Sequence, residues 1–82
     1  MYLHIGENHL IPYENIIYIF SIKDDLKNKK EDFLRNIEKE NFLDCTENLK
    51  ARSIIGCSDG KVYISPINSH TLRKRFEEFL LI

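Results

Sequence analysis

The segment from Asn15 to Ile22 limits what this chain can fold into more than any other feature. Its central residues, Ile16 to Phe20, are all β-branched or aromatic, which is typical of a β-strand. A half-buried strand alternates apolar with polar residues, but both faces of this strand are apolar. We therefore expect a strand that is central with both faces covered, or one that another subunit covers on one side.

The length of the chain restricts how that strand can be covered. With 82 residues there is room for one domain, spanning residues 1–82, and such a domain buries only about 60% of the surface that its unfolded chain exposes. The hydrophobic fraction of 43% is too high for a disordered chain. No apolar run approaches a membrane span of about 20 residues, and no secretory leader opens the sequence. We expect a cytoplasmic protein without membrane contact.

Three further segments complete the predicted fold. In residues 2–11, two short strand-like segments flank a cluster of turn residues, and this pattern predicts a hairpin. A narrow apolar stripe predicts a helix from about Leu26 to Glu40, and the polar stretch from Asn41 to Leu49 predicts a loop. A last helix follows Pro66 with one apolar face. Together with a second hairpin, these segments predict an α+β domain with a small, mainly antiparallel sheet of about five strands and two helices.

The second hairpin joins residues 52–57 to residues 61–65. Asp59-Gly60 at its centre predicts a two-residue type I′ turn, because both residues tolerate a positive φ. That turn fixes which side chains share a face. The predicted register pairs Cys57 with Val62 and Ile55 with Ile64 on one side, and Gly56 with Tyr63 and Ile54 with Ser65 on the other.

No residue pattern predicts catalysis. The chain has three glycines, each in a turn or strand, and no arrangement of serine, histidine and aspartate suited to nucleophilic chemistry. His4 and His9 flank the first turn, but two histidines without spaced partners indicate ordinary strand residues rather than a metal site. Cys45 and Cys57 match no redox or zinc spacing. We expect no enzyme activity, no cofactor, no metal and no small-molecule substrate.

Charge is distributed unevenly along the chain. Residues 1–47 carry ten acidic and six basic side chains, whereas residues 48–82 carry six basic and three acidic ones. A basic face on the second hairpin, extended by the last helix, is a candidate surface for phosphates. Its predicted nucleic-acid-binding residues are Lys50, Arg52, Lys61, Tyr63, Arg73, Lys74 and Arg75. The alternative is a solvated face whose lysines prevent wrong strand pairing, and the residues alone favour this alternative.

Three segments resemble one family. Met1–Gly6, the strand Asn15–Phe20, and Val62–Ile67 running into Ser69–Arg75 are similar to the RemB branch of RemA and RemB, the small bacterial extracellular-matrix regulators. The resemblance covers nearly the whole chain and implies a compact protomer that assembles into rings. For the RemA branch it also implies DNA binding and transcriptional control of biofilm matrix genes, with arginines lining the assembled surface.

The chain also differs from RemA-like sequences at positions where those sequences have arginines. Leu49-Lys50 stands where RemA-like chains have an arginine pair, and Asn15 stands where they have an arginine ahead of the strand. Arg52 matches an arginine of the motif. Two hypotheses follow: a ring-forming regulator that contacts the phosphates of double-stranded DNA through the basic face, or an oligomeric scaffold or adaptor that acts by protein contact without DNA.

Overall fold

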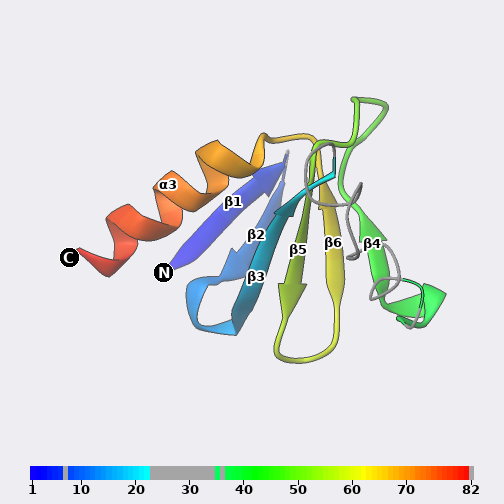
Figure 1. Ribbon diagram of the computed structural model, residues 1–82, viewed down its shortest axis with the longest axis horizontal. Coiled ribbons are helices and arrows are strands. Elements are labelled where there is room, and N and C mark those ends of the chain that lie inside the picture. Colours follow the sequence, from blue (N-terminus) through cyan, green and yellow to red (C-terminus); the bar gives the residue numbers. More distant parts are fainter. Residues whose placement is uncertain (7, 23–34, 36, 82) are drawn as a thin grey trace.

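The computed structural model describes residues 1–6, 8–22, 35 and 37–81 (Figure 1). Its elements, in chain order, are β1 (Tyr2–Gly6), β2 (His9–Pro12), the 3₁₀ turn η1 (Tyr13–Asn15), β3 (Ile16–Ser21), the 3₁₀ turn η2 (Lys39–Asn41), β4 (Phe42–Asp44), β5 (Ser53–Cys57), β6 (Val62–Ser65) and α3 (Ser69–Leu80). Most of the predicted helix from Leu26 to Glu40 lies outside the described residues. Within them, α3 is the one α-helix with both ends defined.

The strands form two sheets rather than the single sheet that the sequence predicts. β1 and β2 make an antiparallel hairpin, and the four-stranded sheet has the order β3-β5-β6-β4. The α+β class is confirmed, but the expected loop from Asn41 to Leu49 is wrong because β4 runs parallel to β6 within it. A strand of three residues is too short for alternation to reveal it.

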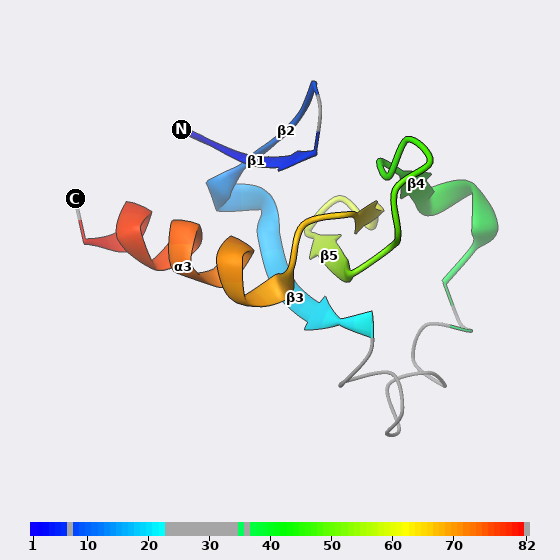
Figure 2. The ribbon, with the colours of Figure 1, turned by 90° about the horizontal axis from the view of Figure 1, so that it is seen from above.

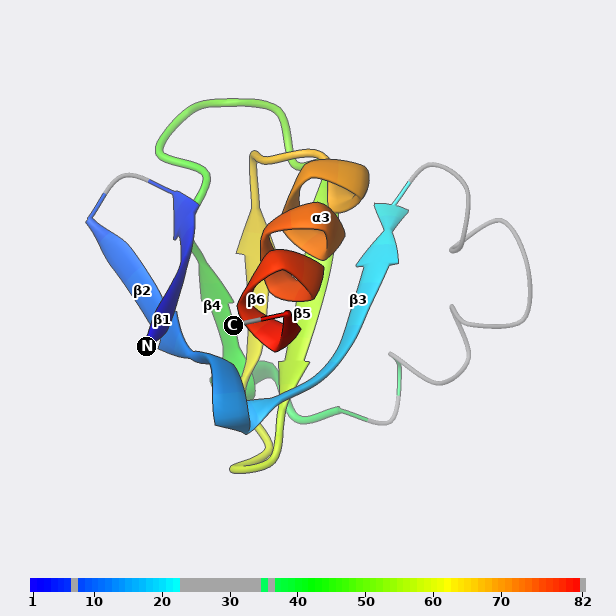
Figure 3. The same cartoon turned by 90° about the vertical axis from the view of Figure 1, so that its left-hand side faces the viewer.

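One face of the four-stranded sheet carries the core. The β1–β2 hairpin and α3 both lie on this face, and α3 runs between β1 and β3 (Figures 2 and 3). The buried apolar residues of this layer form one cluster: Leu3, Ile5, Ile11, Ile19, Cys45, Ile55, Cys57 and Leu72. The hairpin is tied to the sheet through the buried Ser65 hydroxyl, which donates to the carbonyl of Ile5. A single two-layer core therefore unites elements from both ends of the chain.

The turn between β5 and β6 has three residues, Ser58 to Gly60, and the predicted two-residue turn is wrong. Gly60 has φ +87°, whereas Asp59 stays out of the left-handed region. The Cys57 N–H donates to the Lys61 carbonyl at 2.9 Å, which closes a loop of the kind that combines a type I turn with a left-handed glycine. The Asp59 carboxylate accepts from the Lys61 N–H at 3.0 Å and supports this geometry.

The three-residue turn moves the register by one position from the prediction. The observed pairs are Ser53 with Ser65, Ile54 with Ile64, Ile55 with Tyr63 and Gly56 with Val62. Directly opposed residues share a face. Tyr63 and Ser65 therefore lie on the core side with Ile55, and Val62 and Ile64 lie on the other side with Ile54.

β3 is an edge strand, not the central strand that its apolar residues suggest. A β-bulge between Ile16 and Tyr18 places the intervening Ile17 outward, with 66% of its surface exposed. The bulge lets Ile16 pack against the core cluster while Tyr18 turns to the opposite face. There the Tyr18 ring stacks on Phe20, with centroids 4.5 Å apart. Both faces of β3 thus hold apolar contacts, and Ile17 remains at the surface.

Gly56 is required by the ring of Tyr18. A Cβ atom at position 56 would lie 1.9 Å from Tyr18 Cζ. We expect Gly56→Ala to lower the free energy of unfolding by about 1–3 kcal/mol, because the ring must leave its place over the strand. Urea unfolding measures this loss. In a Tyr18→Ala background the same substitution is expected to cost much less, and an equal cost in both backgrounds would show that the ring is not the cause.

Candidate nucleic-acid interface

The β4–β5 loop, residues Thr46 to Arg52, carries two of the predicted phosphate contacts. It begins after the Cys45 N–H, which donates to the Ile64 carbonyl at 2.8 Å, and it ends where the Arg52 N–H donates to the Ser65 carbonyl at 2.9 Å. Both ends of the loop are therefore fixed to β6, in the middle of the fold.

A type I′ turn forms the first part of this loop. Glu47 and Asn48 have φ values of +49° and +73°, and the Leu49 N–H donates to the Thr46 carbonyl at 3.0 Å. Two successive left-handed residues that are not glycine cost about 1–2 kcal/mol each, so surrounding contacts must hold them in place.

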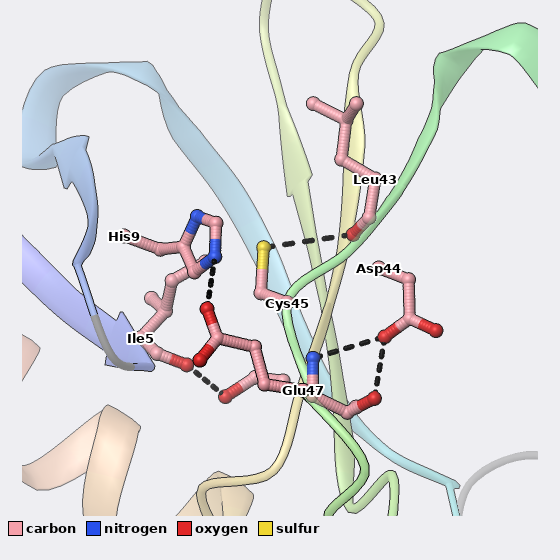
Figure 4. A network of polar contacts seen from close by, with 8 residues as sticks. Ile5, His9, Leu43, Asp44, Cys45 and Glu47 are labelled. Carbon is pink, nitrogen blue, oxygen red and sulfur yellow. Dashed lines mark hydrogen bonds and ion pairs between the residues drawn. The ribbon is translucent and has the colours of Figure 1, made fainter.

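The first supporting contact comes from Asp44. One carboxylate oxygen, Oδ1, accepts from the Thr46 hydroxyl at 2.6 Å and from the Thr46 N–H at 2.9 Å (Figure 4). The hydroxyl bond, followed by the backbone bond, lowers the pKa of the Asp44 carboxyl. The ionised carboxylate thus fixes the start of the turn, and Thr46 itself is buried.

The second supporting contact comes from the β1–β2 hairpin. His9 Nε2 lies 3.4 Å from Glu47 Oε1, and Figure 4 shows the glutamate directed toward β2. Glu47 is the only acid in the sequence of the loop. Its side chain lies beside His9 but stays 44% exposed, so the exposed residues of the loop are Glu47, Asn48, Leu49 and Lys50, with Arg52 at its end.

The structure separates other members of the predicted basic face from Lys50 and Arg52. Lys61 is exposed but follows the turn at the opposite end of the β5–β6 hairpin (Figure 1). Tyr63 is half-buried against the core cluster, and burial raises the pKa of its phenol. The position of Tyr63 follows from the register, because the predicted pairing would have placed it on the side away from Ile55.

Arg73 holds the open edge of the four-stranded sheet. The Ile22 N–H donates to the Arg52 carbonyl, at the start of β5. Along an antiparallel strand, residues that hydrogen-bond the partner strand alternate with residues that do not. Phe20 therefore hydrogen-bonds β5, and Ile19 does not. The Ile19 carbonyl therefore points away from β5, and Arg73 Nη2 donates to it at 2.6 Å. A charged side chain on an outward carbonyl protects an edge strand from pairing with another chain.

Arg75 makes the corresponding hydrogen bond to an edge carbonyl of the β1–β2 sheet. The Tyr13 N–H donates to the Met1 carbonyl, so Met1 is hydrogen-bonded to the β2 side of the hairpin. By the same alternation His4, three residues later, is not bonded to β2, and its carbonyl lies on the outer edge of β1. Arg75 Nη1 donates to that carbonyl at 2.9 Å. Two of the three helical cations thus fasten α3 to the strand on either side of it, although Arg73, Lys74 and Arg75 are all exposed residues.

The two cysteines are free thiols within the core. Burial raises the pKa of Cys45, and it raises the pKa of Cys57 to about 11. Both thiols are therefore protonated and poorly nucleophilic near neutral pH. Within residues 1–6, 8–22, 35 and 37–81, no group of three histidine, cysteine or acidic side chains is arranged to hold a metal ion, and no helix is long and apolar enough to cross a bilayer.

Comparison with known sequences places the chain in a family. A sequence model of the RemA-like family, described as extracellular matrix regulatory protein A-like, matches residues 2–76. The chain belongs to the RemA-like family. It is also similar to the extracellular matrix regulatory protein B of Bacillus subtilis (strain 168), with 27% identity over 75 residues that cover 92% of this chain and 89% of the relative. The family membership that the sequence segments suggested is confirmed.

The residues that shape the loop of this RemA-like chain were not found by sequence reasoning. The turn is supported by Asp44, Thr46, Glu47 and His9, yet the polar stretch from Asn41 to Leu49 predicted only a loop. A signal was present, because aspartate two residues before a threonine forms such side-chain turns and asparagine tolerates a left-handed backbone. The contact from His9 had no local signal, since it joins residues 38 positions apart in the sequence.

We expect Arg73→Ala to lower the free energy of unfolding by about 1 kcal/mol, because it removes a charged hydrogen bond to an edge carbonyl. The neighbouring Lys74→Ala removes the same charge from the same helix and is expected to change stability by less than about 0.5 kcal/mol. Denaturant unfolding of the two variants measures the difference. Equal losses would contradict the structural role assigned to Arg73.

Proposed function

We propose that this RemA-like chain is a cytoplasmic, non-enzymatic regulator of extracellular-matrix genes that self-assembles and contacts the phosphates of double-stranded DNA through Lys50 and Arg52. The observation that carries the proposal is the β4–β5 loop, in which a braced turn is followed by these two exposed cations and the one acid lies beside His9. Family membership supports the regulatory role. Lys61 and Lys74 are exposed and supply further contacts only where the duplex passes near them.

Two cations in one copy are too few for useful affinity. Each phosphate contact contributes a roughly fixed increment through counterion release, and proteins that bind duplex DNA well make about 6–10 such contacts. Several copies on one duplex would supply that number, and linked copies gain affinity because each further contact becomes intramolecular. Self-assembly is therefore part of the proposed DNA binding rather than an addition to it.

The exposed apolar residues support self-assembly. The large apolar side chains that are more than half exposed in the described chain are Met1, Tyr2, Leu10, Ile17, Leu49, Leu80 and Leu81. Strand addition at β1, β2 or β3 is a poor route to assembly, because Arg73 and Arg75 occupy edge carbonyls and Pro12 removes a donor from β2. We infer that copies associate through side-chain surfaces, with the ring implied by the family resemblance as the closed form.

A second candidate function is an oligomeric scaffold or adaptor that acts by protein contact. The observation that favours it is that three of the predicted phosphate-binding residues make contacts within the fold. Arg73 and Arg75 are bonded within the fold, and Tyr63 packs against the core. Under this alternative, Lys50 and Arg52 are solvated and assembly is independent of nucleic acid.

Light scattering with and without random duplex DNA, at two salt concentrations, tests the proposal. We expect an oligomer at both salt concentrations and a larger complex with DNA at low salt. Lys50→Ala with Arg52→Ala is expected to abolish the DNA complex without changing the oligomer, whereas either single variant is expected to weaken binding and to reduce its salt slope by about one per bound copy.

Lys39→Ala is the matched control, because Lys39 is an exposed cation in η2, away from the β4–β5 loop. It is expected to bind DNA as the unchanged protein does. An oligomer that shows no DNA complex at low salt would favour the scaffold. A well-folded monomer at all concentrations would contradict both candidate functions.

A further inference from the structure

Leu49 is the apolar tip of the β4–β5 loop. Its side chain is 66% exposed, directly after the type I′ turn and directly before Lys50. Asp44 and His9 contact the turn from two different strands, and the Leu49 N–H closes it on the Thr46 carbonyl, so the backbone at Leu49 is fixed. A leucine held out to solvent beside two cations is not explained by phosphate binding, because phosphates do not attract apolar groups.

We propose that Leu49 enters the minor groove as an apolar wedge at a base step, while Lys50 and Arg52 hold the neighbouring phosphates. This inference rests on the proposed function. Proteins that bend DNA insert leucine and similar residues between base pairs from the minor groove, and flanking cations hold the backbone on either side. The β4–β5 loop carries both chemistries within four consecutive residues, 49–52.

The shape of the loop favours the minor groove over the major groove. The major groove is about 12 Å wide and accepts a helix or a two-stranded ribbon, whereas the minor groove is about 6 Å wide. The exposed part of the loop is a single turn with one projecting apolar side chain. Such a tip is narrow enough for the minor groove, and it has too few side chains near one another to read the major groove.

The residue type favours DNA over a protein pocket. Residues that dominate protein interfaces are mainly tryptophan, tyrosine and arginine, and leucine is under-represented among them. A wedge must also be rigid, because unstacking a base step is unfavourable and a mobile side chain would move aside. The braced turn supplies that rigidity.

Leu49→Ala tests the wedge, and Lys39→Ala is the control. Lys39 is exposed in η2, ahead of β4, so the control changes a surface away from the β4–β5 loop and from the exposed apolar residues. Affinity and DNA bending are measured with duplexes labelled at both ends for energy transfer. We expect Leu49→Ala to weaken binding on the order of tenfold and to remove the bend, with no change in the salt slope. Lys39→Ala is expected to retain the affinity and the bend.

A second variant and a second duplex sharpen the test. Leu49→Met keeps a large apolar side chain and is expected to keep the bend. Duplexes with flexible TA steps are expected to bind more tightly than stiff A-tracts, and this preference is expected to disappear with Leu49→Ala.

The outcomes separate the wedge from the proposed function. Unchanged affinity and bend in Leu49→Ala would overturn the wedge and leave phosphate binding intact. Loss of the oligomer in Leu49→Ala would also overturn it and would assign Leu49 to a contact between copies or with a partner protein. If the unchanged protein binds no duplex, the proposed DNA contact fails and the wedge fails with it.

Discussion

The structure depends on the register between β5 and β6, which the three-residue turn at Ser58–Gly60 sets. Because a shift of one residue would exchange the two faces of a strand, this turn decides which side chains enter the core. It places Ser53, Ile55 and Ser65 in the core layer, where all three are fully buried. The two serine hydroxyls then donate to carbonyls outside the sheet, Ser65 to Ile5 and Ser53 to Ile67.

These hydrogen bonds connect the hairpin register to the candidate site. The bond to Ile5 holds the β1–β2 hairpin against β6, and that hairpin brings His9 to Glu47. The bond to Ile67 holds the segment that leads into α3, from which Arg73 and Arg75 reach the edges of both sheets. The braced loop and the two capped edges therefore follow from one pairing in the middle of the sheet.

The sequence predicted the fold where local chemistry was decisive. The first hairpin, the strand at Ile16–Phe20, both strands of the second hairpin and the last helix were found from alternation, turn residues and one apolar helix face. The errors arose where distant contacts were decisive. Asp59-Gly60 allows two turn types, and only the packing of Ile55 and Tyr63 against the core distinguishes them. β4 has three residues and is defined by its partner β6 rather than by its own pattern.

For the candidate site, too, the sequence revealed local features but not contacts between distant residues. A sequence can reveal that Lys50 and Arg52 are cations close together, and it can reveal the basic run from Arg73 to Arg75. It cannot reveal that Arg73 and Arg75 donate to carbonyls of β3 and β1, because those bonds span 54 and 71 positions. Arg73 and Arg75 therefore have a role within the fold that their charge alone does not reveal.

Hydrogen–deuterium exchange of the protein, with and without duplex DNA, distinguishes the β4–β5 loop from α3 as the surface that meets DNA. We expect DNA to slow exchange in the backbone from Thr46 to Arg52 and to leave α3 and the interior of β6 unchanged. Slower exchange across α3 with no change in the β4–β5 loop would contradict the proposed contact, because it would place the DNA on the helix whose arginines we assign to the fold.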